Sequence, residues 1–186
     1  MKVKLFTLVA VSLSTILAAD GGTFLRVRSS PRGAGVFVDG KYVGPAGRFS
    51  VPEKYAIEPG SHEITLKDPR YEDTTIKLDA KAGKTNKIGA KLKKKEPPKG
   101  PFGRLRLRGG EAESFWSVAA GDIGAVYLNG MFVGHVDELN DVGGGLLVPA
   151  GTYEMKVQSQ LYGEFTKTVT IEANKVNRVD YGKREQ

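Results

Sequence analysis

The chain has 186 residues, of which 40% are hydrophobic and 26% charged, and its formal net charge is +7. These values are typical of a globular protein and exclude a disordered polymer or a bundle of membrane spans. The absence of cysteine and the presence of only two histidines exclude disulfides, thiol chemistry and the common zinc sites, so we expect no metal ion and no other cofactor.

Residues 1–19 have the pattern of a secretory signal peptide. Lys2 and Lys4 precede an apolar run over residues 5–17, and Ala18 and Ala19 provide small residues for cleavage. The alternative is an uncleaved membrane anchor, but the run is shorter than the ~20 residues that a membrane span requires. We therefore expect cleavage near Ala19, a mature chain without a transmembrane segment, and export to the periplasm or the cell surface.

A repeated segment organises the rest of the chain. Residues 36–44, VFVDGKYVG, recur as residues 126–134, VYLNGMFVG, and further matches precede and follow this pair in the same order. Repetition in one order indicates two copies of one small domain. We predict domains at residues 20–92 and 103–182, a linker at 93–102 and a polar tail at 183–186.

The repeated segments have the patterns of strands and tight turns. Residues 25–28 and 105–108 alternate apolar side chains with arginines, the period of a half-buried strand. Two further alternating segments on each copy predict a closing hairpin around residues 81–84 and 173–174. No helical period is sustained after residue 20. The predicted fold class is therefore all-β, with two small antiparallel β-sandwich domains in tandem.

Tight turns are predicted at equivalent places in the two copies. An Asp-Gly or Asn-Gly pair between aromatic and β-branched residues is the strongest local signal for a type I′ hairpin. A second turn precedes another alternating strand in each copy. The predicted turn residues are Asp39, Gly40, Asn129, Gly130, Pro59, Gly60 and Gly151.

Residues 29–34, SSPRGA, followed by residues 36–44, the Pro59-Gly60 turn and Tyr71, resemble the PEGA family, which is named for a Pro-Glu-Gly-Ala motif. The resemblance covers Thr23 to about Leu92, with Arg32 where the motif has Glu. The second copy keeps the hairpin and the strand after Gly151 but lacks the signature. The resemblance implies β-sandwich modules of exported or envelope proteins, often associated with surface layers or polymers, and it brings no catalytic residues.

The second copy contains a ten-residue insertion between its first two strands, and this insertion holds Phe115 and Trp116, the only tryptophan of the chain. Adjacent aromatic residues on a long loop are suited to stacking on a sugar ring or anchoring a protein partner. They are equally suited to folding back as a cap on the sandwich. Phe115 and Trp116 are therefore the candidate ligand-binding residues.

Positive charge is concentrated at the predicted linker. Basic residues outnumber acidic ones by 12 to 9 in residues 20–90 and by 8 to 1 in residues 91–108, whereas acidic residues lead by 11 to 6 afterwards. Lysines around prolines favour a semi-rigid, extended linker that spaces the domains. These lysines either attract an anionic envelope polymer or lipid head group, or only keep the linker solvated. The candidates are Lys91, Lys93, Lys94, Lys95 and Lys99.

The sequence gives little support to catalysis. His62 shares a strand face with apolar residues and is interpreted as a packed histidine, while His135 has no matching nucleophile motif nearby. The acidic loop at 135–145 fits no calcium-binding spacing and is interpreted as a solvated polar loop.

We therefore expect a non-catalytic binding or scaffolding module of the cell envelope, associated with a polysaccharide or another anionic surface polymer. The alternative is a protein-interaction module that uses the same aromatic residues, or an exposed edge strand such as residues 23–28. A purely structural spacer is a third possibility. No interaction with nucleic acid is expected.

Overall fold

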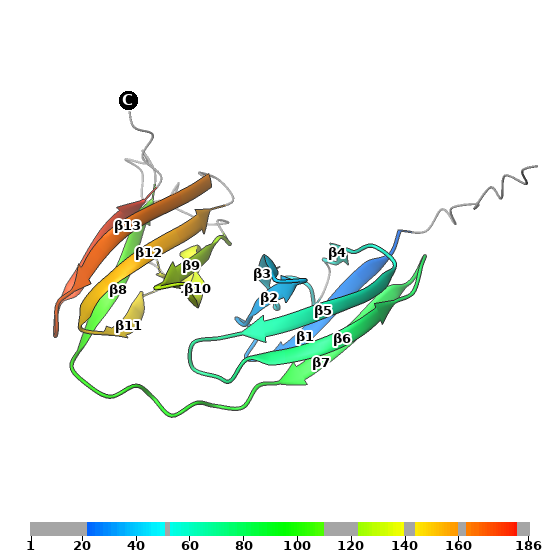
Figure 1. Cartoon of the computed structure of the whole chain (residues 1–186), viewed down its shortest axis with the longest axis horizontal. Coiled ribbons are helices and arrows are strands. Elements are labelled where there is room, and N and C mark those ends of the chain that lie inside the picture. The colour runs from blue at the N-terminus through cyan, green and yellow to red at the C-terminus, as the bar shows by residue number, and fades with distance from the viewer. Residues whose placement is uncertain (1–21, 51–52, 110–122, 140–143, 160–162, 182–186) are drawn as a thin grey trace, which may run out of the picture.

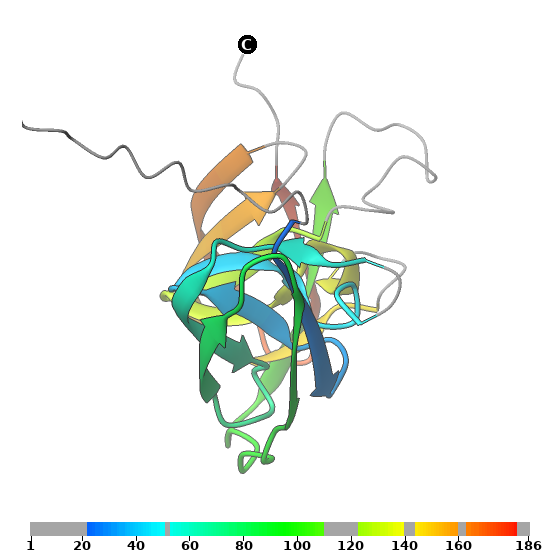
Figure 2. The same cartoon turned by 90° about the vertical axis from the view of Figure 1, so that its right-hand side faces the viewer.

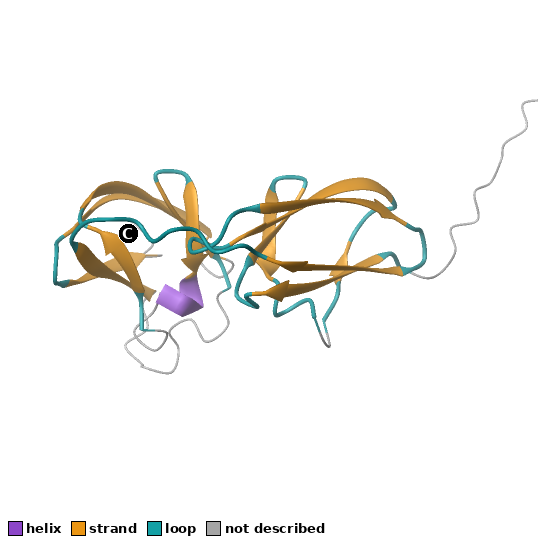
Figure 3. Cartoon of the chain, turned by 90° about the horizontal axis from the view of Figure 1, so that it is seen from below, coloured by secondary structure: helices purple, strands orange, loops and turns teal. Residues whose placement is uncertain are grey.

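The structure, a computed structural model, describes residues 22–50, 53–109, 123–139, 144–159 and 163–181. The predicted signal peptide and polar tail lie outside these ranges. Within the described ranges the elements are strands, apart from the one-turn helix α1 (Val136–Leu139), which is purple in Figure 3, so the all-β prediction is confirmed. The helix replaces part of the loop expected at residues 135–145, because Val136 and Leu139 are both buried in the core of the second copy.

The first copy, which we call the first unit, contains two sheets packed against each other (Figure 1). One sheet has the strand order β4-β1-β7 and the other the order β3-β2-β5-β6. The strands are β1 (Phe24–Ser30), β2 (Gly35–Val38), β3 (Lys41–Pro45), β4 (Tyr55–Ala56), β5 (Gly60–Lys67), β6 (Thr74–Ala80) and β7 (Thr85–Lys91).

The C-terminal half, which we call the second unit, has the same strand order. Its sheets have the orders β11-β8-β14 and β10-β9-β12-β13. The strands are β8 (Phe102–Gly109), β9 (Ala125–Leu128), β10 (Met131–His135), β11 (Leu146–Pro149), β12 (Gly151–Ser159), β13 (Gly163–Ile171) and β14 (Val176–Tyr181). Equal order in both halves agrees with the repeat seen in the sequence.

The last strand of each unit does not form the predicted closing hairpin. β6 pairs with β5, whereas β7 crosses to the other sheet and pairs in parallel with β1, and β14 pairs in parallel with β8 in the same way. The turns that follow β6 and β13 therefore connect strands of two different sheets, instead of neighbouring strands of one sheet. β1 lies between β4 and β7, so the expectation that residues 23–28 form an edge strand was wrong.

Each unit has its own apolar core between its sheets. Leu25 and Val27 of β1 and Ile64 and Leu66 of β5 are completely buried in the first unit. Leu105 and Leu107 of β8 lie in the core of the second unit, as the alternation with arginines predicts.

The predicted Asp-Gly and Asn-Gly turns have the left-handed backbone that a type I′ hairpin needs. The φ angles are 50° and 79° at Asp39 and Gly40, and 48° and 75° at Asn129 and Gly130. Each turn side chain also accepts a hydrogen bond from a neighbouring strand: the Glu63 N–H donates to Asp39 Oδ1 at 2.9 Å, and the Glu154 N–H donates to Asn129 Oδ1 at 2.8 Å.

His62 occupies the start of β5 and is half-buried instead of packed within the core. Its Nδ1 lies 2.7 Å from Asp39 Oδ2, and its Nε2 lies 2.8 Å from the Glu58 carbonyl oxygen. Hydrogen bonding to Asp39 raises the pKa of His62 above its usual 6.5, and the same bond lowers the pKa of Asp39 below 3.8. At the equivalent place in the second unit, the Tyr153 hydroxyl donates to the Pro149 carbonyl at 2.8 Å.

The Asp39–His62 pair makes the stability of the first unit depend on pH. The raised pKa of His62 stabilises the fold fully below pH 6.5 and loses effect as the pH rises through the folded pKa, while the lowered pKa of Asp39 stabilises it above pH 3.8. We expect His62→Gln to reduce stability at pH 5.5 and to have a smaller effect at pH 9. Denaturant unfolding at both pH values measures the difference, and an equal effect at both would contradict the assignment.

The two units lie side by side along the longest axis of the molecule (Figure 1), and a view along that axis shows the second unit behind the first (Figure 2). The linker runs past the junction of the units. Its ends are fixed: the Lys95 N–H donates to the Arg70 carbonyl and the Ala150 N–H donates to the Pro101 carbonyl. Although the linker was expected to space the domains, the units are in direct contact, as the following section describes.

Candidate functional site

The two type I′ hairpins face each other across the junction. β2 and β3 supply Phe37 and Tyr42, and β9 and β10 supply Tyr127 and Phe132, which occupy the equivalent positions of the repeat. The ring centroids of Phe37 and Phe132 lie 5.6 Å apart at 87°, and those of Tyr42 and Phe132 lie 5.8 Å apart. Such edge-to-face contacts are favourable for aromatic rings. The same surface of each repeat thus packs on the other.

Burial of Phe37 shows that this contact is intimate. Val36 and Val38 point into the core of the first unit, so alternation places the Phe37 side chain on the outer face of β2. There it is only 5% exposed, because the second unit covers it. Gly35 is part of the fit: a Cβ at this position would lie 2.7 Å from Phe132 Cζ.

Hydrogen bonds cross the junction beside the aromatic rings. The Tyr42 hydroxyl donates to the Ile123 carbonyl oxygen at 2.6 Å and also lies 2.6 Å from Nδ1 of His135. The other ring nitrogen, Nε2, lies 2.7 Å from the Gly33 carbonyl oxygen. His135 is 1% exposed, so its ring is enclosed by both units.

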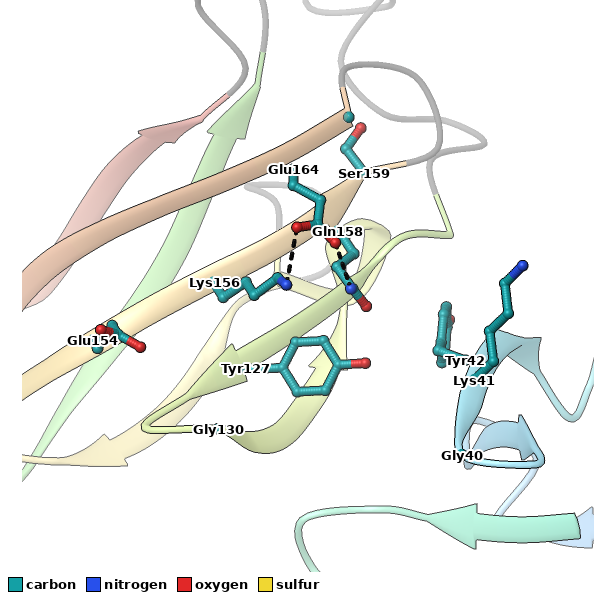
Figure 4. A pocket seen from close by; sticks show the side chains of 11 residues that line it. Gly40, Lys41, Tyr42, Tyr127, Gly130, Glu154, Lys156, Gln158, Ser159 and Glu164 are labelled. Carbon is teal, nitrogen blue, oxygen red and sulfur yellow. Dashed lines mark hydrogen bonds and ion pairs between the residues drawn. The ribbon is translucent and has the colours of Figure 1, made fainter. Parts of the chain in front are cut away.

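A cleft of about 570 Å³ lies beside the aromatic cluster, and we call it the junction cleft. Figure 4 shows Tyr42 and Lys41 of the first unit on one side and Tyr127 with the β12 side chains on the other. The remaining lining residues come from the second unit and from the hairpin turns: Gly40, Gly130, Glu154, Lys156, Gln158, Ser159, Gly163 and Glu164.

The polar side chains on the second-unit wall hold one another in place. Lys156 Nζ lies 2.9 Å from Glu164 Oε2, and the Gln158 amide donates to Glu164 Oε1 at 2.7 Å. Hydrogen bonds from Lys156 and then from Gln158 lower the pKa of Glu164. This wall therefore presents a fixed carboxylate, amide and ammonium group next to an aromatic ring.

Tyr127 is the aromatic residue of the second unit that lines the cleft. Partial burial, with a smaller effect from the Glu164 charge, raises its pKa to about 12, so the phenol is neutral at physiological pH. In Figure 4 its hydroxyl points across the cleft toward the first unit. It forms no hydrogen bond with any described residue, which leaves both its donor and its acceptor available to a ligand.

A second cavity, of about 380 Å³, lies at another part of the junction and is acidic. Its lining includes Gly33 and Asp68 from the first unit and Asp137 and Glu138 from the second. Asp68 is buried and forms a two-pronged ion pair with Arg70, at 3.0 and 2.8 Å. Burial raises the pKa of Glu138.

Of the predicted site residues, the structure describes the five linker lysines but not the two aromatic residues. Phe115 and Trp116 lie outside the described residues. Of the candidate lysines, Lys93 pairs with Glu72 at 2.9 Å and Lys95 approaches Asp73 at 3.8 Å. Lys91, Lys94 and Lys99 are exposed and form no ion pair with a described residue. None of the five lines the junction cleft.

Sequence reasoning missed the junction residues, although a signal was present. Residues 36–38 and 126–128 are apolar or aromatic on both faces of a short strand, whereas a strand with one wet face alternates. An aromatic residue on the outer face in both copies indicates that this face is covered.

Comparison with known protein families gives a match for the first unit. Residues 23–96 match the PEGA domain. The match covers all seven strands of the first unit, including the parallel β1–β7 pair, and the second unit lies outside it. No curated protein and no solved structure matches the chain. In the described part of the chain there is no helix of the length and hydrophobicity that a membrane span requires.

Proposed function

We propose that the protein is an exported, non-catalytic binding module of the cell envelope that holds a surface polysaccharide in the junction cleft. The PEGA match of the first unit and the signal-peptide pattern of residues 1–19 support an extracytoplasmic module. The equal strand order supports the second unit as a divergent copy of the same domain. The observation that carries the binding proposal is the Tyr127 ring, whose hydroxyl has no hydrogen-bond partner among the described residues, beside the Glu164 carboxylate that Lys156 and Gln158 hold.

This combination matches the chemistry of a sugar ring. The apolar face of a sugar packs on an aromatic ring, and its hydroxyl groups hydrogen-bond to planar amide and carboxylate groups. One hydrogen bond joins Gln158 to Glu164, and Lys156 pairs with the same carboxylate, so part of the side-chain entropy is already lost before a ligand binds. The exposed linker lysines add a non-specific, salt-sensitive attraction to an anionic polymer.

Tyr127→Ala is expected to weaken polysaccharide binding at least tenfold, because it removes both the ring and the hydroxyl. The measurement is retention of the purified protein on isolated surface polysaccharide and on peptidoglycan sacculi, in buffer and in ~0.5 M salt. Tyr127→Phe separates the contribution of the ring from that of the hydroxyl. Met131→Ala is the matched control, because Met131 is 66% exposed on the neighbouring strand and does not line the cleft.

The result also decides between sites. If the wild type and Tyr127→Ala bind equally well, the cleft is not the site, and Phe115 and Trp116 become the residues to replace. If salt releases the wild type completely and neutral substitutions at Lys94 and Lys99 abolish retention, attachment is purely electrostatic.

A protein partner is the second candidate, and one observation favours it. β13 lies at the edge of its sheet, pairs only with β12, and exposes most of its side chains. An exposed edge strand can accept an added strand from a partner. Loss of amide signals along β13 on mixing with an envelope protein, with the cleft unaffected, would favour this function.

A further inference from the structure

The outer face of the β4-β1-β7 sheet is positively charged. The apolar residues of β1 point into the core, so alternation places Arg26 and Arg28 on the outer face. Lys87 of β7 lies opposite Arg26 in the parallel pair and shares this face. The described residues of the three strands include no acidic side chain. We call this surface the basic face and define it by Arg26, Arg28, Lys54, Lys87 and Lys91.

The cations of the basic face have no acidic partner in the protein. Arg26, Arg28 and Lys87 form no ion pair with a described residue. The Nε of Arg26 is buried and has no hydrogen-bond partner among the described residues. Like charges directly opposite each other weaken a strand pair, so the facing Arg26 and Lys87 do not serve the stability of the sheet. Local rules of this kind are broken mainly at functional sites.

The equivalent face of the second unit is different. Arg108 is the repeat equivalent of Arg28, and it lies opposite Asp180 in the pair of β8 with β14. Its Nε lies 2.7 Å from Asp180 Oδ1, so the protein itself supplies the anion. In the first unit the residue opposite Arg28 is Gly89, which has no side chain to pair with it. The same position therefore lacks its counterion in one unit only.

A cavity of about 370 Å³ lies beside the end of β1, and we call it the arginine cavity. Its lining consists of Arg28, Ser29, Arg32, Ala46, Gly47 and Ser50. The Gly47 N–H donates to the Arg32 carbonyl at 2.8 Å, which fixes the backbone of Arg32 at the cavity wall. The Ser29 hydroxyl oxygen is buried and has no hydrogen-bond partner among the described residues.

No carboxylate of the neighbouring segment neutralises the two arginines of the cavity. Glu53 is the one acidic residue between β3 and β4, and it pairs with Arg48 instead. Arg32 is exposed and, like Arg28, forms no ion pair with a described residue. The arginine cavity thus combines two guanidinium groups without counterions and one hydroxyl without a hydrogen bond.

This set of donors fits a phosphate group. A guanidinium presents its N–H groups as a fork that matches two oxygens of a phosphate. A phosphate has enough oxygens for two such forks and a hydroxyl, whereas a carboxylate has only two oxygens. Side chains two residues apart on a strand are spaced by about 6.6 Å. Arg26 and Lys87 can therefore contact a second anionic group of a ligand whose first group lies at Arg28.

The composition of the face favours a polymer over a membrane as the source of these groups. Surfaces that bind a membrane combine cations with apolar side chains that enter the lipid. The large apolar residues that are exposed in the described ranges, Met131, Leu147 and Val176, all belong to the second unit. On the basic face the Phe24 ring is only half-exposed, and Lys54 Nζ lies 5.0 Å from its centroid.

We propose that the arginine cavity binds a phosphate group, and that the basic face extends this site for a linear polymer that carries repeated phosphate groups. The cavity is lined by residues of the first unit alone, so the site is independent of the junction cleft and of the polysaccharide proposed there. The attraction is electrostatic and weakens with salt.

Nuclear magnetic resonance titration of the protein measures this binding at a constant ionic strength that is maintained with chloride. The two probes are inorganic phosphate and a linear glycerol-phosphate oligomer. We expect saturable shifts of the Ser29 and Gly47 amides and of the Arg28 Nε–H, with the oligomer binding about tenfold more tightly than inorganic phosphate or better. Shifts that do not saturate, or an oligomer that binds no more tightly than phosphate, would overturn the proposal.

Substitutions in the two units locate the site. Arg28→Gln and Arg32→Glu should each weaken oligomer binding about tenfold or more, because each removes a charge-assisted hydrogen bond. Arg32→Glu introduces the residue that the family motif has at this place, so the fold should accept it. Arg108→Gln is the matched control for Arg28→Gln, and equal weakening by the two would contradict a site on the first unit. Dispersed amide signals show that each variant is folded.

Two further comparisons separate this site from the junction cleft and from a lipid surface. Tyr127→Ala should leave oligomer binding unchanged, whatever it does to polysaccharide retention. Vesicles that contain phosphatidylglycerol supply the same phosphate chemistry on a membrane, and we expect excess oligomer to prevent the protein from sedimenting with them. If the vesicles still carry the protein down in excess oligomer, the partner is a membrane and the proposal is overturned.

Discussion

Gly103→Ala is expected to destabilise the second unit by about 3 kcal/mol, at the upper end of the cost of overpacking. A Cβ at this position would lie 2.2 Å from the backbone oxygen of Glu172 and 2.7 Å from Ile171 Cγ2. A backbone oxygen cannot turn away as a side chain can, so β8 must separate from the end of β13. Denaturant unfolding monitored by amide signals of each unit should show the second unit unfolding first.

Gly89→Ala on β7 is the matched control for this substitution. It also lies in a strand of a three-stranded sheet, but its added Cβ would be 3.7 Å from the nearest atom, an ordinary contact. Its effect should stay within about 0.5 kcal/mol. Equal effects of the two substitutions would contradict the close approach of β8 to Glu172.

Phe132→Ala is expected to separate the two units and to lower the free energy of unfolding by about 3 kcal/mol, because Phe→Ala substitutions at buried sites cost that much or more. Phe132 is 8% exposed and contacts Phe37 and Tyr42 of the first unit. Spin labels at Lys77→Cys on β6 and Thr168→Cys on β13, one exposed site in each unit of a chain without cysteine, should report a narrow distance distribution in the wild type and a broad one in Phe132→Ala.

Leu147→Ala provides the control, since Leu147 is an apolar residue of the second unit that is 58% exposed. It should change neither stability nor the distance distribution. If Phe132→Ala retains the narrow distribution of the wild type, the aromatic cluster does not hold the units together and the hydrogen bonds of His135 must do so alone.

Local sequence patterns predicted the parts of the fold that local chemistry determines. Alternation in residues 25–28 and 105–108 identified strands whose apolar residues lie in the two cores. The Asp-Gly and Asn-Gly pairs marked turns where the backbone is left-handed. Glycine and asparagine or aspartate tolerate this conformation better than other residues, so the sequence carries the information directly.

The pairing of the last strand could not be predicted in the same way. A turn around residues 81–84 has the same composition whether β7 folds back on β6 or crosses to β1. The choice depends on contacts such as Leu25 with Asn86 and Val27 with Ile88, about sixty residues apart in the chain. Hydrophobic alternation and turn composition describe neighbouring residues only, so they do not indicate which distant strand β7 pairs with.

The junction was missed for a related reason. His135 meets the Gly33 carbonyl across 102 residues, and a backbone carbonyl has no sequence signature. The sequence shows aromatic residues at equivalent positions of β2 and β9, but their position beside a tight turn does not by itself indicate that a second unit covers them. Because Phe115 and Trp116 lie outside the described residues, their role stays a prediction.

The hydrogen bonds that fix both ends of the linker also affect how strongly the two units associate. Only residues 96–100 separate the hydrogen bonds at Lys95 and Pro101, so the linker keeps the two hairpins at an effective concentration of the order of millimolar. A contact with millimolar affinity between separate molecules would therefore be closed about half of the time within this chain. The gain or loss of one hydrogen bond can then change the occupancy of the closed form substantially, and the same surfaces on two separate polypeptides would not associate at micromolar concentration.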